Sequence, residues 1–177
     1  VGKALKGTSI RITSIGENNL SEINEPGMIE IKGPNVFMGY LNKPEKTKEA
    51  FTDDEYFITG DMGYFDKEGY LFISGRNKDL IISGGYNLYP KEIEDIINQF
   101  DGIIESAVFG LSDDDLGEIP TAAIVANENN FNLDDLKKFI QENLARYKVP
   151  KKYFLISELP RNVMGKVQKN ILKAKYS

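Results

Sequence analysis

The segment at residues 75–94 carries a mixture of side chains that could do chemistry. It reads GRNKDLIISGGYNLYPKEIE. Arg76 supplies a guanidinium that could neutralise a nucleotide anion, and Gly84 and Gly85 leave bare backbone that a ligand can approach closely. A strand and a helix alone would need an apolar run and the helix start at Pro90, but neither the arginine nor both glycines. Local rules leave two alternatives, a surface ion pair for the arginine and a hairpin turn at the glycines.

Two further charged residues stand where they could act on a ligand. Asp61 follows a strand-like run and Gly60, so a carboxylate at that strand end could accept two hydrogen bonds from the hydroxyls of a ribose; an Asx turn that caps the strand is the alternative. Lys166 ends a loop bounded by Pro160 and Gly165. An ammonium on a mobile loop could enter a site and stabilise charge on a phosphate or carboxylate, whereas an isolated loop lysine is simply solvated.

The composition excludes several kinds of chemistry. The 177 residues contain no cysteine and no histidine, so disulfides, thiol nucleophiles, imidazole bases and serine–histidine triads are impossible. The residues therefore predict no metal site in this chain. The lack of cysteine fits a reducing cytosol and a cytoplasmic protein. No apolar run approaches the length of a membrane span, and the first residues lack the apolar core of a signal peptide.

Charge is distributed unevenly along the chain. The net charge of -5 argues against a nucleic-acid partner, because nucleic-acid-binding surfaces usually carry a basic stripe. The C-terminal third nevertheless holds many cations, namely Lys148, Lys151, Lys152, Arg161, Lys166, Lys169, Lys173 and Lys175. This end could attract an anionic small molecule, or its lysines could form the solvated face of a helix.

The first part of the chain has the pattern of a small antiparallel β-unit. Short β-rich runs alternate with turn signals such as those at residues 25–27 and 66–69, as is typical of strands joined by tight connections. The expected strands lie at residues 9–15, 28–31, 56–59 and 70–74.

The second part has the pattern of a compact α+β domain. Apolar residues recur at helical spacing after Pro90 and after Asn132, and each start has carboxylates in its first turn. We expect strands at residues 106–110, 121–126 and 153–156 and a final helix at 168–176. The predicted fold class is α+β, with a small antiparallel β-rich subdomain at 1–75 followed by a compact α+β domain at 76–177, in which helices cover a small sheet.

Five segments, in sequence order, resemble motifs of the adenylate-forming acyl-CoA synthetases, the AMP-binding enzyme family. Residues 26–41 are similar to the GELxIxGxxxxxGYL block, 56–61 to YxTGD, 75–94 to GRxKDxIxxxGxNxxPxEIE, 146–150 to YKxP and 159–166 to LPRNxxGK. The resemblance covers the whole chain. Two of these segments have sequences most similar to the malonyl-CoA synthetase branch, SGGYNLYPKEIE and PRNVMGKVQKN. Other fatty acyl-CoA synthetases are nearly as similar.

This resemblance implies a two-step ligase. A carboxylate attacks the α-phosphate of ATP to give an acyl-adenylate and pyrophosphate, and the CoA thiol then displaces AMP. The substrates would be ATP, CoA and a small-molecule carboxylate. The similarity to the malonyl-CoA synthetase branch favours malonate. A medium- or long-chain fatty acid is one alternative. A non-catalytic module that binds CoA or a protein partner through the basic tail is an alternative from another class.

The resemblance also implies a role for each matching residue. Asp61 would hold the ribose hydroxyls, and Arg76 would contact the ribose and AMP region. Lys166, the expected catalytic residue, would also bind ATP by bridging the substrate carboxylate and the phosphate in the first step. Lys78 matches the position of a hinge, with Asp79 beside it, about which the final domain would rotate between the two steps.

The same resemblance places CoA at one motif and points to missing parts. The run Gly84, Gly85 and Tyr86 would line the pantetheine channel, where bare backbone permits the closest approach. Asn87 stands where some relatives have arginine, which argues against a phosphate contact of CoA there. The family's phosphate loop and magnesium-binding glutamate are not among the 177 residues. We therefore expect a C-terminal fragment: the last β-subdomain of a large N-terminal domain and the complete mobile domain. Mg²⁺ would be held by the missing part, and the fragment alone should not complete the reaction.

Overall fold

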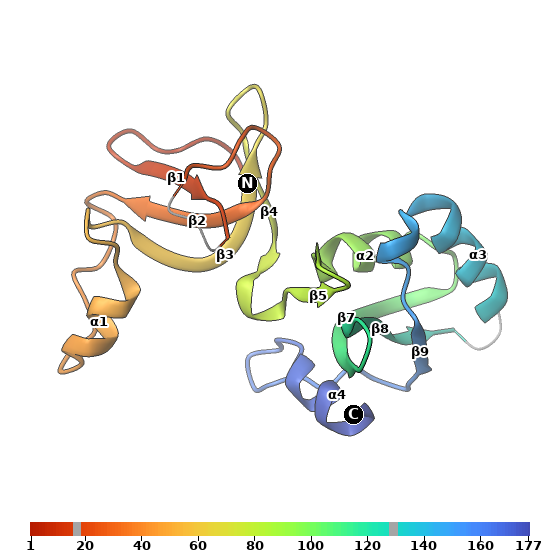
Figure 1. The fold of residues 1–177 in the computed structure, drawn as a ribbon. Coiled ribbons are helices and arrows are strands. Elements are labelled where there is room, and N and C mark those ends of the chain that lie inside the picture. Colours follow the sequence, from red (N-terminus) through yellow and green to blue (C-terminus); the bar gives the residue numbers. More distant parts are fainter. Residues whose placement is uncertain (16–18, 128–130) are drawn as a thin grey trace. The chain divides into compact units, whose positions relative to one another are not determined.

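A computed structural model describes residues 1–15, 19–127 and 131–177 of the chain. These residues form two compact units, 1–78 and 79–177 (Figure 1). The first unit contains a four-stranded sheet, and the second contains a five-stranded sheet with helices packed on it. This architecture confirms the α+β fold class that the sequence predicts.

The helices and strands follow one another along the chain in a simple order. They are β1 (Ser9–Thr13), β2 (Gly27–Lys32), α1 (Pro44–Ala50), β3 (Phe57–Phe65), β4 (Leu71–Arg76), the 3₁₀ turn η1 (Asn77–Asp79), β5 (Ile81–Ser83), β6 (Tyr86–Leu88), α2 (Pro90–Ile97), β7 (Ile103–Asp113), β8 (Gly117–Ala126), α3 (Leu133–Asn143), the 3₁₀ turn η2 (Arg146–Lys148), β9 (Lys152–Leu155) and α4 (Lys169–Tyr176).

The sheet of the first unit is antiparallel throughout, in the order β1-β2-β3-β4. Because successive side chains of a strand point to opposite faces, alternate residues of these strands reach the core. Ile12, Ile29 and Leu71 form that core and are each less than a tenth exposed. In Figure 1 these strands, coloured red to yellow, lie side by side.

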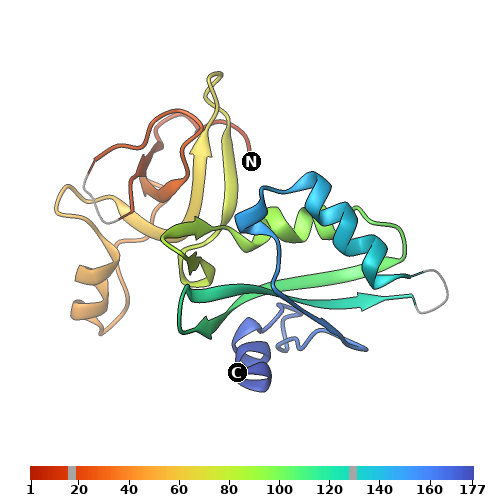
Figure 2. The same cartoon turned by 45° about the vertical axis from the view of Figure 1, so that its right-hand side comes forward.

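The sheet of the second unit is built on the long antiparallel pair β7 and β8. The strand β5 joins β8 at Ser83, and β9 runs parallel to β8. Figure 2 shows α2 and α3 on one face of this sheet and α4 on the other. Alternation along β8 serves both faces, since Ile124 packs with α2 and α3 while Ala123 packs with α4.

The expected helix starts agree with the structure. Pro90 is the first residue of α2, as its fixed φ favours. The Oδ1 atom of Asn132 accepts hydrogen bonds from the N–H groups of Asp134 and Asp135, over 2.8 and 3.2 Å, and so caps α3. The final helix, expected from residue 168, begins at Lys169.

Three differences from the expected elements concern the first unit and its boundary. The strand β3 continues well past the predicted residues 56–59, because the residues after Gly60 still pair with β4. The helix α1 is not among the expected elements. All of its residues lie at least partly in solvent, so it lacks the apolar stripe that indicates a helix. The short strands β5 and β6 form the hairpin that local rules leave open.

Candidate functional site

Asp61 and Arg76, two of the predicted nucleotide contacts, lie opposite each other in the ladder of β3 and β4. The Nε atom of Arg76 is 2.6 Å from Oδ1 of Asp61, and the two side chains are 53% and 30% exposed. Such an accessible ion pair contributes little to stability, because water screens it. It leaves a second carboxylate oxygen, which could accept hydrogen bonds from hydroxyls, and further guanidinium N–H groups, which could bind an anion.

The local structure around Asp61 corrects the sequence interpretation. Asp61 lies inside β3, neither at a strand end nor in an Asx turn, and beside a register irregularity of the β3–β4 ladder. Gly60 has φ of 75°, which bends the strand. The Thr59 hydroxyl donates to the carbonyl of Ile29 over 2.8 Å and accepts from the N–H of Asp61 over 3.0 Å. The backbone of Asp61 is thus fixed by a neighbouring side chain.

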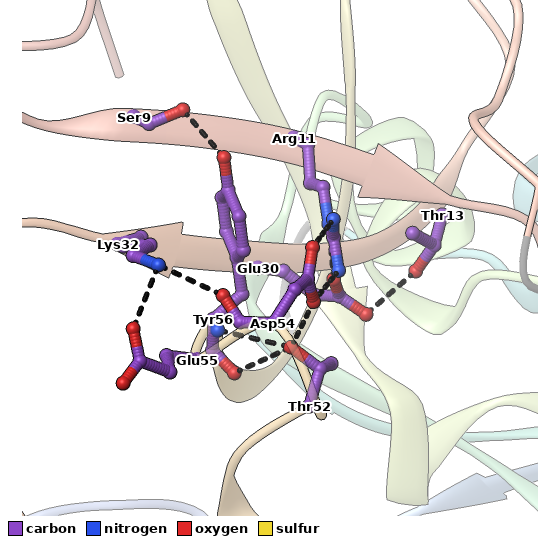
Figure 3. Close-up of polar contacts among 9 residues, drawn as sticks. All are labelled: Ser9, Arg11, Thr13, Glu30, Lys32, Thr52, Asp54, Glu55 and Tyr56. Atoms are coloured by element: carbon purple, nitrogen blue, oxygen red, sulfur yellow. Dashed lines mark hydrogen bonds and ion pairs between the residues drawn. The ribbon is translucent and has the colours of Figure 1, made fainter.

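A polar network on the first unit lies upstream of the strand that bears Asp61 (Figure 3). The two terminal nitrogens of Arg11 bind both oxygens of Asp54, over 2.5 and 2.9 Å, and its Nε contacts Glu30 over 2.6 Å. The hydrogen bond from Arg11 is the main reason that the pKa of Asp54 is lowered to about 2, with a smaller part from Thr52. The network fixes the turn that leads into β3. Sequence reasoning missed it, because nothing in the local pattern links Arg11 to Asp54.

Lys78 and Asp79, the predicted hinge, belong to the short 3₁₀ turn η1. Lys78 is exposed and Asp79 is half-buried. The first compact unit ends at Lys78, and the second begins at Asp79. A short connecting turn can absorb a large change of backbone dihedral angles. The hinge role itself remains a prediction.

Gly84 and Gly85 form the two-residue turn of the β5–β6 hairpin. Their φ angles are 56° and 82°, which suits the type I′ turn favoured in tight hairpins. The hairpin alternative is therefore observed. A Cβ atom built on Gly85 would meet nothing within 4 Å, so this side of the turn is open within its unit. An open turn is compatible with the predicted contact to a pantetheine arm.

The structure brings two predicted motifs together at this hairpin. Tyr86 stacks on Tyr147 of the YKxP segment, with ring centroids 4.6 Å apart. Next to that ring, the Nζ atom of Lys148 lies 2.5 Å from Oε1 of Glu92 at the start of α2. No periodic pattern predicts these contacts, because the partners are far apart along the chain and both tyrosines are substantially exposed.

Lys166, the predicted catalytic residue, belongs to the second unit, whereas Asp61 and Arg76 belong to the first. Its side chain is exposed, in a turn that precedes α4. In the part of the chain that the structure describes, the ammonium of Lys166 has no ion-pair partner. The group is therefore available to a ligand.

Much of the basic C-terminal third is neutralised by glutamates of the same unit. The cations Lys148, Arg161, Lys169 and Lys173 pair with Glu92, Glu105, Glu94 and Glu118 respectively. Pairing lowers the positive field that these residues could present to an anionic partner. It weakens the alternative in which the basic tail is a general docking surface.

Residues 1–15, 19–127 and 131–177 contain no group of three or more carboxylates placed to hold a metal ion. In the same residues, no helix has the length and hydrophobicity required to cross a membrane.

Comparison with known proteins places these features in a family. Residues 92–166 match the family described as AMP-binding enzyme C-terminal domain. The chain is 43% identical over 176 residues to a 2-succinylbenzoate–CoA ligase of Listeria monocytogenes. The matched region covers 99% of this chain and 35% of the relative. It is 41% identical over 176 residues to the long-chain-fatty-acid–CoA ligase FadD13 of Mycobacterium tuberculosis, covering 99% of this chain and 34% of the relative.

Solved structures give the same result. ATP-bound MatB from Rhodopseudomonas palustris matches with a TM-score of 0.92 and 47% identity, over 99% of this chain and 35% of that one. The o-succinylbenzoate CoA synthetase MenE of Bacillus subtilis, in complex with its acyl-adenylate intermediate, matches with a TM-score of 0.90 and 37% identity, over 97% of this chain and 35% of that one. The chain spans about a third of the length of the relatives it matches.

Proposed function

Because this chain belongs to the AMP-binding enzyme family of adenylate-forming acyl-CoA ligases, we propose that the gene product carrying it joins a carboxylic acid to CoA in two steps. In the first, a carboxylate oxygen attacks the α-phosphorus of ATP, and the bond to pyrophosphate breaks. In the second, the CoA sulfur attacks the acyl carbon, the bond to AMP breaks and the thiol proton is released. The products are an acyl-CoA, AMP and pyrophosphate.

The observation that carries this proposal is the pairing of Asp61 with Arg76 in one strand ladder. The two residues come from separate motifs, and each is assigned to the nucleotide by the resemblance. A carboxylate can accept hydrogen bonds from both hydroxyls of a ribose, and an adjacent guanidinium can neutralise the phosphate attached to that ribose. We propose that ribose binding replaces part of this ion pair.

The remaining motif residues would divide the two steps between them. The ammonium of Lys166 would stabilise the negative charge that develops between carboxylate and α-phosphate in the first step. A change of dihedral angles at Lys78 and Asp79 would then exchange the lysine for the hairpin at Gly84 and Gly85, along which pantetheine would enter. Water exclusion in each closed state would protect the acyl-adenylate from hydrolysis.

We propose malonate as the acid. The sequences of the hairpin and tail motifs support this substrate, because they are most similar to the malonyl-CoA synthetase branch. A second candidate is 2-succinylbenzoate, because the Listeria monocytogenes relative that acts on it is 43% identical. Both candidates carry two carboxylates, whereas the fatty-acid alternative carries one. We also propose a cytoplasmic location, since the cysteine-free composition fits a reducing compartment.

A panel of carboxylic acids, each assayed with the purified gene product, tests both the ligase reaction and the choice of malonate. ATP, CoA and one acid at a time (malonate, 2-succinylbenzoate, octanoate or palmitate) would be followed by pyrophosphate release and by mass spectrometry of the thioester. We expect malonate to give the highest kcat/KM. A preference for palmitate would contradict the substrate but keep the ligase. CoA binding without pyrophosphate release for every acid would favour the non-catalytic module instead.

A further inference from the structure

Lys166 stands in a closed turn, residues 161–167, whose two ends pair as an antiparallel bridge. The N–H of Asn162 donates to the carbonyl of Lys166 over 2.9 Å, and the N–H of Gly165 donates to the carbonyl of Asn162 over 2.9 Å. Gly165 closes the turn with φ of 78°, a conformation that suits glycine. The backbone that carries the lysine is therefore hydrogen-bonded on the inside of the turn.

The side chain of Asn162 adds two further hydrogen bonds at the tip. Its Oδ1 atom accepts from the N–H groups of Met164 and Lys166, each over 3.0 Å. Val163 and Met164 are 105% and 74% exposed, so apolar packing cannot hold the tip. Asparagine hydrogen-bonds its own following backbone in this way in many turns. Polar contacts alone fix the position of the Lys166 backbone within the tip.

Arg161 connects the turn to the sheet of the second unit. One terminal nitrogen forms an ion pair with Glu105 on β7, and the other donates to the carbonyl of Gly165 over 2.7 Å. A planar guanidinium suits this double contact, because its N–H groups point in fixed directions. The turn is thus anchored to β7 on the side that precedes the lysine.

A second anchor follows the lysine. The Nζ atom of Lys169, the first residue of α4, lies 2.6 Å from Oε1 of Glu94, and the two side chains are only 18% and 14% exposed. The same oxygen accepts from the N–H of Val108 over 2.8 Å. Glu94 ends the motif that begins at Gly75. Removing one member of such a poorly hydrated pair is costly, so this anchor ties α4 firmly to α2 and β7.

We propose that Asn162 and Arg161, supported by the Lys169–Glu94 pair, are positioning residues that hold Lys166 ready for adenylation. This inference rests on the proposed role of Lys166. A flexible lysine would have to be ordered in every catalytic cycle, whereas a preformed turn presents the ammonium with its backbone already fixed. Misplacement of a catalytic group by about 1 Å can lower a rate about a hundredfold.

The test uses the gene product that carries this chain. The variants are Asn162→Ala, Arg161→Ala and Lys166→Ala. Asn143→Ala is the matched control, because it removes an exposed asparagine that binds backbone four residues away at the end of α3. Pyrophosphate release with ATP and the acid gives kcat and KM for adenylation. Thioester formation from supplied acyl-adenylate gives the second step, and hydrogen exchange of the peptide 159–168 reports the turn.

The proposal predicts that Asn162→Ala lowers the kcat of adenylation about ten- to a hundredfold, with KM for ATP and thioester formation nearly unchanged. Exchange at the tip amides should become about tenfold faster, and Asn143→Ala should change neither quantity. Wild-type adenylation in Asn162→Ala and Arg161→Ala, beside a strong loss in Lys166→Ala, would overturn the positioning role alone. Wild-type rates in all three would also overturn the assignment of Lys166.

A rescue variant separates positioning from misfolding. Asn162→Asp keeps an oxygen that can accept from both N–H groups. If Asn162→Ala loses both half-reactions through misfolding, Asn162→Asp should restore slow exchange and most of the adenylation rate. Restored exchange with adenylation as slow as in Lys166→Ala would contradict the proposal.

Discussion

The two compact units differ in how they bury apolar side chains and where they place charge. The first unit has a small core cluster at Ile12, Ile29 and Leu71, and large side chains such as Met38 and Leu41 are 98% and 88% exposed. The second unit buries apolar residues on both faces of its sheet, under α2 and α3 on one side and α4 on the other. Its fold is therefore determined mainly by apolar burial.

Polar contacts play correspondingly different parts. In the first unit, Arg11 joins two strands and a turn through Glu30 and Asp54, so a charged network supplements a small core. In the second, the ion pairs of Arg161 and Lys169 hold the segment around the proposed catalytic lysine. We therefore expect core truncations to lower the stability of the second unit most, and removal of the Arg11 network to be the main charge effect on the stability of the first.

The largest effect should follow a core truncation in the second unit. Phe109 is 1% exposed and packs between the sheet and α4. Phe109→Ala should lower the free energy of unfolding of this unit by about 4 kcal/mol, because it removes buried surface and leaves a cavity. Hydrogen exchange of each unit under increasing urea measures the change. An equal loss of protection in the first unit would contradict this difference between the units.

A charge truncation in the first unit should have the next largest effect. Glu30 has a side chain only 8% exposed, and Arg11→Met removes its cationic partner. We expect the free energy of unfolding of that unit to fall by about 2 kcal/mol, because a poorly hydrated carboxylate is left without its cationic partner. Lys32→Met is the matched control, since the carboxylate of Glu55 is 81% exposed, and it should cost less than about 1 kcal/mol. Equal effects of the two variants would argue against the network.

Stability should change by a smaller amount at the acid and alkaline ends of the pH range. The pKa of Asp54 in the first unit is lowered from 3.8 to about 2, mainly by the hydrogen bond from Arg11. Its contribution should be complete above pH 3.8 and be lost as the pH falls through about 2. Burial raises the pKa of Tyr153 in the second unit from 10.0 to about 12, so the stability of that unit should fall as the pH rises from 10.0 to about 12, because the phenol ionises first in the unfolded chain.

Matched variants identify these two titrations. Asp54→Asn should remove the acid loss from the first unit, and Tyr153→Phe should remove the alkaline loss from the second. At neutral pH, Tyr153→Phe should leave stability unchanged or slightly higher, because the hydroxyl has no hydrogen-bond partner in the part of the chain that the structure describes. Urea unfolding at each pH gives both results. A marked destabilisation by Tyr153→Phe would indicate a hydrogen bond in solution.

Local sequence signals predicted those features of the fold that local physics determines. Pro90 and Asn132 mark helix starts, because one has a fixed φ and the other has a side chain that accepts from the first turn. The fold class followed from the change between two-residue and helical periodicity. The sequence pattern predicts too early an end for β3, because Gly60 resembles a turn signal although the chain continues to pair with β4.

The candidate site was predictable as a set of residues but not as a set of contacts. Motif resemblance singled out Asp61, Arg76 and Lys166, yet the pairing of the first two depends on an irregular strand register that no local pattern encodes. The partner of Arg161 is equally hidden, since Glu105 lies 56 positions earlier on another element. Contacts between distant segments require the packed fold.

The most direct test of the proposed roles of Asp61 and Lys166 separates the two half-reactions in Asp61→Ala and Lys166→Ala of the gene product, with Lys138→Ala as an exposed-lysine control. Lys166→Ala should slow adenylation about a hundredfold or more and spare thioester formation from supplied acyl-adenylate. Asp61→Ala should slow both steps, because AMP is held in each. Equal loss of both half-reactions in Lys166→Ala, with Lys138→Ala unchanged, would contradict the role of Lys166 in adenylation.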